Sequence, residues 1–494
     1  MHSITKINYR YLLLSPRRWI LRLLLISLAY FAFTRLMEIR MTSGTGMSLG
    51  NVLRLSKRVS TSSEGGRIKR DDWCTEAEYL DGEWLKRDED VTLMRLREIY
   101  QYTNEGEFKC MARDLPRGSE PPEGNPDHYV RILETAQYEW KPKSGCRKHQ
   151  WDAWNFAKFC LRSRGGCSLV GDSLADQIYR AVYYTMVTKH DSLFDINRSI
   201  DRVYNITVNR NHPLAPRLAR EAGISEERFA RPVLNYWREH HLLHRSELDG
   251  IFKGVWYYEP WVNGPTYFQN GWIHDRSWWY ELWSDLLAKP IQLIERPDGS
   301  LPIEETSTIS FNSAPHWTAI ELWPSHSFRL VKNEDLLRGW IGAFTRVLEK
   351  VTAAAQEYDV LAWWRSTVPG HPECWQYLAP ENNRTDHFST QNPNADYFNW
   401  NLYPIMDQYA SSRLGYNPSE SNQYLRPTRF YMRYLDLWSI SVKRPDAHLN
   451  PTIDCSHYCL PGVPQEWLGL VWHLTVSSAR NQDYDEPSSL TKWH

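Results

Sequence analysis

The chain has 494 residues, of which 42% are hydrophobic, and its 58 basic and 59 acidic residues leave a net charge of −1. This length allows one elaborated α/β domain or two to three smaller domains. The balanced charge, with no basic block in the body, argues against a nucleic-acid partner. The 24 Trp and 28 Tyr residues indicate core and rim packing first, although flat aromatic rings also suit sugar rings.

The N-terminal segment is typical of a membrane anchor. Residues 19 to 33 are mostly apolar and are preceded by several arginines. No small-residue cleavage site follows, which favours an uncleaved signal-anchor, with a removed signal peptide as the alternative. Positive charge before the span predicts a cytosolic N-terminus and a lumenal body. We therefore expect the following organisation: cytosolic tail 1–18, transmembrane signal-anchor 19–37, flexible stalk 38–70 and lumenal catalytic domain 71–494.

From about Trp73 onward, predicted strands and helices alternate. Apolar runs predict strands at 168–171, 254–261, 307–311, 360–364 and 435–442. Helical spacing predicts helices over 174–186, 337–351 and 464–474. The alternation favours an α/β fold with a parallel sheet covered by helices on both faces, and a site at the carboxyl ends of the strands. The polar, aromatic segment 382–427 is too long for an inert connection and predicts a functional surface.

Eight cysteines lie between Cys74 and Cys459, without a CxxC pair and without a Cys/His cluster of zinc spacing. They indicate disulfides in an oxidising compartment, and no metal site is expected. Sequons at Asn197, Asn205 and Asn383 agree with lumenal exposure and are candidates for glycosylation.

Gly171-Asp172-Ser173-Leu174 lies where the first buried strand meets its helix. A serine there is held on a rigid scaffold, with its own N–H at a helix N-terminus, where it can stabilise developing negative charge. An ordinary helix N-cap is the alternative interpretation of this short motif.

The segment Asp454 to Pro464 supplies the partner for a nucleophile. An acid three residues before a histidine can bond Nδ1 and leave Nε2 to accept the serine proton. Here Asp454 precedes His457, and Cys455 and Cys459 flank the histidine. Together the two motifs predict a Ser173–His457–Asp454 triad.

The sequence resembles the plant trichome-birefringence-like proteins and the wider PC-esterase group of the GDSL/SGNH superfamily, with a non-plant branch of that group as an alternative placement. The resemblance runs from about Trp73 to Leu474 and rests on six segments: 74–84, 138–146, 171–174, 310–317, 365–371 and 454–464. Two departures stand out: Ala175-Asp176-Gln177 replaces the usual Arg-Asn-Gln, and Tyr458 replaces a usual Trp.

The resemblance implies an SGNH-hydrolase-like three-layer sandwich on a type II Golgi membrane anchor, which O-acetylates a polysaccharide. It implies that Ser173, His457 and Asp454 are catalytic, and that the Ser173 N–H and Asn312 form the oxyanion hole. Asp172, His316 and Arg365 are candidates for substrate binding. It also implies four disulfides: Cys74–Cys146, Cys110–Cys459, Cys374–Cys455 and Cys160–Cys167.

Three functions remain open at this point. The favoured one is O-acetyl transfer from acetyl-CoA or another acetyl donor, with no resident cofactor, onto hydroxyls of a cell-wall or secreted glycan. A carbohydrate acetyl esterase would use the same triad, with water capturing the acyl-serine. A non-catalytic glycan-binding protein would use only the aromatic surface.

Overall fold

A computed structural model describes residues 72–101, 109–111, 127–189, 192–200, 203–252, 278–322, 332–384, 398–417, 431–452, 454–481 and 483–484. They belong to one compact unit that begins at Asp71. The predicted tail, signal-anchor and stalk lie outside the described residues. Among the described residues, no helix is both long and apolar enough to cross a membrane.

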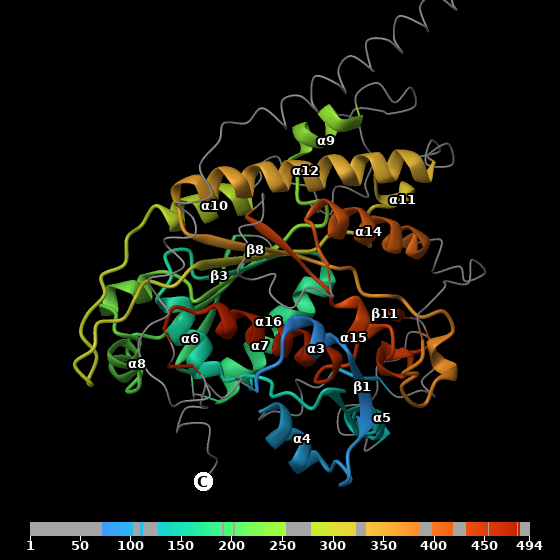
Figure 1. Ribbon diagram of the computed structural model, residues 1–494, viewed down its shortest axis with the longest axis horizontal. Coiled ribbons are helices and arrows are strands. Elements are labelled where there is room, and N and C mark those ends of the chain that lie inside the picture. The colour runs from blue at the N-terminus through green and yellow to red at the C-terminus, as the bar shows by residue number, and fades with distance from the viewer. Residues whose placement is uncertain are drawn as a thin grey trace, which may run out of the picture. The chain divides into compact units, whose positions relative to one another are not determined.

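A seven-stranded sheet organises the described part of the chain (Figure 1). Its strand order is β4(Phe194–Ile200), β5(Val203–Val208), β6(Leu234–Arg238), β3(Cys167–Gly171), β7(Ser307–Phe311), β8(Val360–Arg365) and β9(Met432–Leu435). The five strands from β6 to β9 are mutually parallel, whereas β4 and β5 form an antiparallel edge. The expected α/β fold with a mostly parallel sheet is confirmed.

Helices cover both faces of this sheet (Figure 1). One face carries α9(Arg245–Phe252), α10(Trp278–Leu287), α11(Ala319–Leu322), α12(Asn333–Glu357) and α14(Tyr403–Arg413). The other carries α6(Ala153–Leu161), α7(Ser173–Lys189), α8(Ala215–Ala222) and α16(Val463–Ser478). Each face has its own hydrophobic cluster, one including Trp340 and Phe344 of α12 and the other including Trp467 and Trp472 of α16. Strand β3 is buried along its whole length. Its sequence therefore has the mostly apolar run expected of a central parallel strand.

Smaller elements precede and follow the sheet. Strands β1(Gly82–Lys86) and β2(Tyr138–Pro142) form an antiparallel pair. The pair β10(His448–Asn450) and β11(Asp454–Tyr458) is also antiparallel and follows α15(Trp438–Ser441). Three short helices accompany this pair in the sequence: α3(Glu76–Leu80) before β1, and α4(Leu93–Tyr100) and α5(Asp127–Ala136) between β1 and β2.

Sequence periodicity predicted some elements of the central sheet and missed others. The strands expected at 168–171, 307–311 and 360–364 and the three helices are present. The strand expected at 435–442 is wrong, because the strand ends at Leu435 and residues 438–441 are helical. β4, β5 and β6 were not predicted; in β6, Leu234-Asn235-Tyr236-Trp237-Arg238 places a buried Asn inside the apolar pattern. The strand expected at 254–261 lies outside the described residues.

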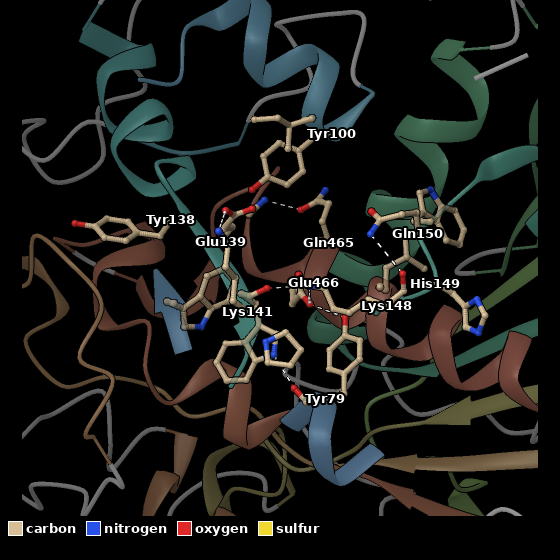
Figure 2. A pocket seen from close by; sticks show the side chains of 18 of the residues that line it. Tyr79, Tyr100, Tyr138, Glu139, Lys141, Lys148, His149, Gln150, Gln465 and Glu466 are labelled. Carbon is tan, nitrogen blue, oxygen red and sulfur yellow. Dashed lines mark hydrogen bonds and ion pairs between the residues drawn. The ribbon is translucent and has the colours of Figure 1, made fainter. Parts of the chain in front are cut away.

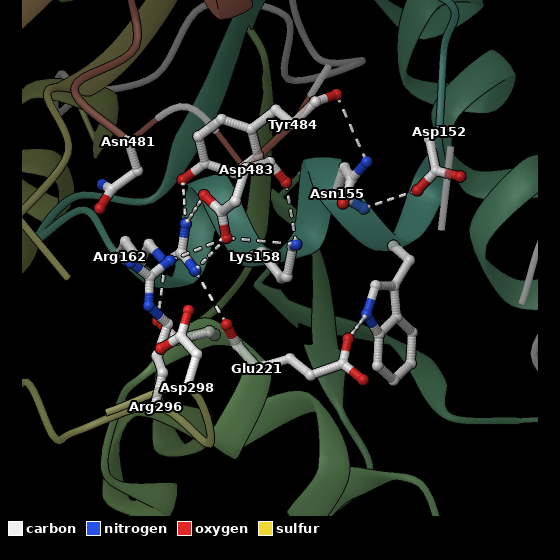
Figure 3. A network of polar contacts seen from close by, with 12 residues as sticks. Asp152, Asn155, Lys158, Arg162, Glu221, Arg296, Asp298, Asn481, Asp483 and Tyr484 are labelled. Atoms are coloured by element: carbon white, nitrogen blue, oxygen red, sulfur yellow. Dashed lines mark hydrogen bonds and ion pairs between the residues drawn. The ribbon is translucent and has the colours of Figure 1, made fainter. Parts of the chain in front are cut away.

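The segment after α16 is fastened back onto α6 by a charged network (Figure 3). Arg162, which caps α6, donates to both carboxylate oxygens of Asp483, at 2.6 and 2.7 Å. Lys158 and Arg296 approach the same carboxylate. Bidentate guanidinium–carboxylate pairs of this kind fix geometry as well as contributing energy. The network therefore holds the end of α16 against the face of the sheet that carries α7.

All four disulfides are those implied by the family resemblance. The bonds join Cys74 to Cys146, Cys110 to Cys459, Cys160 to Cys167 and Cys374 to Cys455. Of the sequons, Asn197 is exposed on β4, Asn205 lies on β5 and Asn383 is exposed; glycosylation there stays a prediction.

Candidate active site

Ser173 stands at the junction of β3 and α7, at the carboxyl end of the central strand. The turn before it requires glycine, because Gly171 has φ +151° and an added Cβ would lie 2.5 Å from the carbonyl oxygen of Asn312. Helix α7 begins at Ser173, so the Ser173 N–H belongs to the first turn, whose amides have no helical carbonyl to bond. The serine is thus presented on a fixed turn, with its amide aimed away from the helix.

The structure brings the two distant motifs together. His457 Nε2 lies 2.6 Å from Ser173 Oγ, and His457 Nδ1 lies 2.7 Å from Asp454 Oδ2. Asp454 Oδ1 also accepts the backbone N–H of His457 at 3.1 Å. This is the nucleophile, base and orienting acid in hydrogen-bonded sequence, as serine-dependent acyl transfer requires.

The histidine is tuned to act as a base. Burial alone would lower the pKa of His457, but the hydrogen bond and negative charge of Asp454 outweigh it and hold that pKa above the ordinary value. Burial would likewise raise the pKa of Asp454, and the contact with His457 outweighs it, so that this pKa lies below its usual range. Asp454 therefore stays ionised and stabilises the imidazolium formed when His457 accepts a proton.

Gln177, one turn after Ser173 on α7, ties the serine helix to the histidine strand. Its Nε2 donates to the Tyr458 carbonyl at 2.7 Å, and its Oε1 accepts the Tyr458 N–H at 3.2 Å. This two-point bond fixes the backbone next to His457 relative to Ser173. Sequence reasoning noted Gln177 only inside a family motif; its i+4 spacing from the serine was the available signal.

Strand β11, which carries His457, is also fixed by disulfides and by a pair of histidines. Cys455 bonds to Cys374, and Cys459, just after the strand, bonds to Cys110. His448 Nδ1 lies 3.0 Å from the His457 carbonyl, and His448 Nε2 lies 2.6 Å from His371 Nδ1. The imidazole of His457 is thereby carried on a strand fixed by covalent and polar contacts.

Two candidate site residues lie behind the serine. Asp172 is fully buried, and its Oδ1 accepts the Leu174 N–H at 2.9 Å, so it caps the start of α7. Asn312 is 2% exposed, and its amide nitrogen, in the orientation that satisfies both groups, donates to the Asp172 carboxylate oxygens at 3.2 Å. Neither residue lines the cavity in front of Ser173. The substrate-binding role considered for Asp172 and the oxyanion role of Asn312 stay predictions, which the buried positions of the two residues do not favour.

A cavity of about 310 Å³ opens in front of Ser173 and His457. Its apolar lining comes from Leu174, Pro315, Val368, Phe398, Trp400 and Tyr403. His316, another substrate candidate, lines it. Arg365 does not: it is 1% exposed, and its guanidinium donates to the Val170 carbonyl of β3, so substrate contact by Arg365 stays a prediction that its burial does not favour.

Three polar residues of this cavity were not predicted. Arg238 ends β6, His240 follows it two residues later, and Glu321 lies on α11. Strand β6 had itself been missed, so no sequence signal placed its end beside the serine. They add charged and imidazole groups to the cavity lining.

A larger cavity of about 580 Å³ lies elsewhere, lined in part by β2 and the start of α16. Its charged groups point toward one another (Figure 2): Glu466 accepts from Lys148 at 2.8 Å and from the Tyr79 hydroxyl at 2.5 Å. Glu139 similarly pairs with Arg87 and Lys141. This cavity contains no serine–histidine pair among its described lining residues.

The fold and the site define a class: an α/β protein with a serine–histidine–aspartate constellation at the carboxyl end of a central parallel strand. Residues 303–474 match the PC-esterase family, described as a GDSL/SGNH-like acyl-esterase family found in Pmr5 and Cas1p. The predicted resemblance to the PC-esterase group is thereby confirmed over this segment of the chain. Ser173 lies outside the matched segment, so it is the geometry that joins it to Asp454 and His457.

Two plant proteins show local similarity. Protein trichome birefringence-like 40 of Arabidopsis thaliana is 33% identical over 85 residues, 16% of this chain and 23% of the relative. Protein trichome birefringence-like 39 of the same plant is 36% identical over 64 residues, 12% and 17% of the two chains. The aligned part thus spans less than a quarter of either relative.

Proposed function

We propose that this chain is an O-acetyltransferase that moves an acetyl group through an acetyl-serine intermediate onto hydroxyls of a cell-wall or secreted polysaccharide. The observation that carries the proposal is the hydrogen-bonded chain Ser173–His457–Asp454, with distances of 2.6 and 2.7 Å. The PC-esterase match and the similarity to trichome birefringence-like proteins support acyl chemistry. The domain would face the Golgi lumen on a type II anchor, in keeping with its four disulfides.

In the first step, His457 accepts the Ser173 hydroxyl proton as Oγ attacks the acetyl carbonyl of acetyl-CoA or another acetyl donor. The tetrahedral intermediate collapses, the imidazolium returns the proton to the leaving group, and acetyl-serine remains. The Ser173 N–H at the start of α7 is placed to stabilise the oxyanion.

In the second step, a sugar hydroxyl enters the cavity and His457 takes its proton. The alkoxide attacks the acetyl-serine carbonyl, and the proton then passes to Ser173 Oγ as it leaves. Water attacking at the same point would make the protein an esterase. The six apolar side chains lining the cavity favour an acceptor that displaces water, because a dry site suppresses hydrolysis of a reactive intermediate.

The test incubates the purified full chain with a donor carrying labelled acetyl groups, in the presence and absence of plant and fungal glycans. We expect label on the Ser173 peptide without acceptor and label on glycan with acceptor. Free acetate alone would assign the esterase reaction instead. If Ser173→Ala leaves acetylation of cellular glycans unchanged, the site is inert and a glycan-binding role replaces the proposal.

A further inference from the structure

His240, His316 and Glu321 form a compact cluster in the cavity that also contains Ser173. One ligand atom from each of the three lies within 4.8 Å of the others. His316 Nδ1 is 2.6 Å from Glu321 Oε1, and His240 Nδ1 is 3.7 Å from Glu321 Oε2. The two imidazole rings stack with their centroids 3.4 Å apart.

The topology explains why these groups converge. His240 follows β6, whereas His316 and Glu321 follow β7. Strands β6 and β7 flank β3 on its two sides, so their carboxyl ends straddle the strand that ends at Ser173. Ligand sites in parallel sheets form at this edge.

The donor set suits a divalent transition metal. Two imidazole nitrogens and one carboxylate oxygen are the ligands of many catalytic zinc centres, which keep a further position open for water or substrate. The geometry supports this set, because all three residues line the same cavity, where an ion held by them would be open to molecules that enter it.

Binding would require the two stacked imidazoles to tilt toward a common ion, because a metal lies near the plane of each ring that binds it, whereas the distances to Glu321 would change little. Ligand atoms around a tetrahedral zinc with bonds of 2.0–2.2 Å lie roughly 3.3–3.6 Å apart. The His316–Glu321 pair, at 2.6 Å, would widen by about 1 Å, and the 3.7 Å His240–Glu321 separation already has the required size. The hydrogen bond of the metal-free cluster thus preorganises the carboxylate that the metal would take over.

We propose that His240, His316 and Glu321 bind one divalent transition-metal ion of the Zn²⁺ class, with an open coordination position facing the cavity. Metal binding itself does not depend on the proposed function. The role of the metal does rest on the proposed function. The open position would take a hydroxyl oxygen of the acceptor. Coordination would lower the pKa of that hydroxyl before His457 removes its proton. The metal would then act on the acceptor, while the triad acts on the acetyl group.

The test titrates Zn²⁺ and Co²⁺ into the metal-depleted full chain. We expect one equivalent to bind, a Co²⁺ absorption band in the visible and a raised melting temperature. Glu321→Gln should weaken Zn²⁺ binding at least tenfold, because it removes the one anionic ligand. Glu466→Gln is the matched control, because the Glu321 and Glu466 side chains have similar exposure, 16% and 17%, but Glu466 lies in the other cavity. The Zn²⁺ affinity of the Glu466→Gln protein should stay within twofold of wild type.

Zinc X-ray absorption on the wild-type chain needs no variant and should show two imidazoles and oxygen ligands at about 2.0–2.2 Å. Binding below one tenth of an equivalent, or equal affinity in wild type and Glu321→Gln, would overturn the metal site. Those results leave the triad untouched. Conversely, metal binding without acetyl-serine formation would refute the proposed function and not the metal site.

Discussion

The two walls of the candidate site are built in different ways. The serine wall is a strand-to-helix junction of the central sheet, where Ser173 sits on a turn set by Gly171. The histidine wall is the small β10–β11 pair, outside the sheet, held by two disulfides and by Gln177. The nucleophile therefore depends on the core, whereas the base depends on cross-links. This difference predicts that perturbations of the two walls have separable effects.

Among changes to the histidine wall, Asp454→Asn should lower activity most. Without the carboxylate, the tautomer of His457 is no longer fixed and its imidazolium is not stabilised, so we expect kcat to fall about 10³–10⁴-fold. Residual activity should also titrate at lower pH, because Asp454 is what holds the pKa of His457 above its ordinary value. Steady-state kinetics over pH measures both. Unchanged kcat would mean that Asp454 does not orient the base.

Removing the covalent support should cost stability as well as rate. A chain-entropy argument gives about 4.5 kcal/mol for a loop the size of Cys374–Cys455 and about 2.4 kcal/mol for one the size of Cys160–Cys167, with separations of 81 and 7 residues. We expect the Cys374→Ala/Cys455→Ala protein to lose kcat in addition, because β11 carries His457. The Cys160→Ala/Cys167→Ala protein is the control.

Denaturant unfolding and kcat, measured on both disulfide variants, provide the comparison. A larger loss of kcat in the Cys160→Ala/Cys167→Ala protein would contradict the assignment of the cross-linked wall to the base, since that disulfide joins α6 to the first residue of β3 and includes no residue of β11.

The histidine wall should also be the more acid-sensitive one. Burial lowers the pKa of His371 to about 3 and holds that of His448 well below its ordinary value, and the pair supports the His457 backbone. The unfolded chain binds protons near pH 6.5 and the folded pair does not. Their stability contribution is therefore present above about pH 6.5 and is lost as pH falls towards the folded values.

Urea unfolding at pH 7, 6, 5 and 4 tests this acid sensitivity. His371→Gln should reduce the dependence of unfolding free energy on pH by about 1.4 kcal/mol per pH unit in that window. An identical slope in wild type and variant would show that His371 is not neutral in the folded protein.

The smallest expected effects concern the link between the walls. Gln177→Ala removes both bonds to Tyr458 and should lower kcat about tenfold with little change in KM, because misplacement of a catalytic group affects the chemical step. Asn312→Ala should lower kcat less than tenfold, since its amide faces Asp172 and not the cavity. A loss of about 10²–10³-fold would instead assign Asn312 to the oxyanion hole.

Sequence reasoning found both walls for different physical reasons. Ser173 was found because a buried parallel strand is a continuous apolar run and the turn after it needs glycine. Asp454 and His457 were found because an acid and a base three residues apart carry their interaction locally. The disulfide pairing came from family resemblance, because cysteine positions alone leave the partners open.

What the sequence by itself determined is the local chemistry: a nucleophile turn, an acid–histidine pair, and strands and helices with strong periodicity. Only the tertiary structure decided what meets across the sheet. His240 and Glu321 could not be assigned to the site, because strand order places the ends of β6 and β7 beside β3 and no pattern within a single segment encodes that order. The burial of Arg365 and Asp172 could not be predicted for the same reason: it depends on what packs over each residue, and long-range packing sets it.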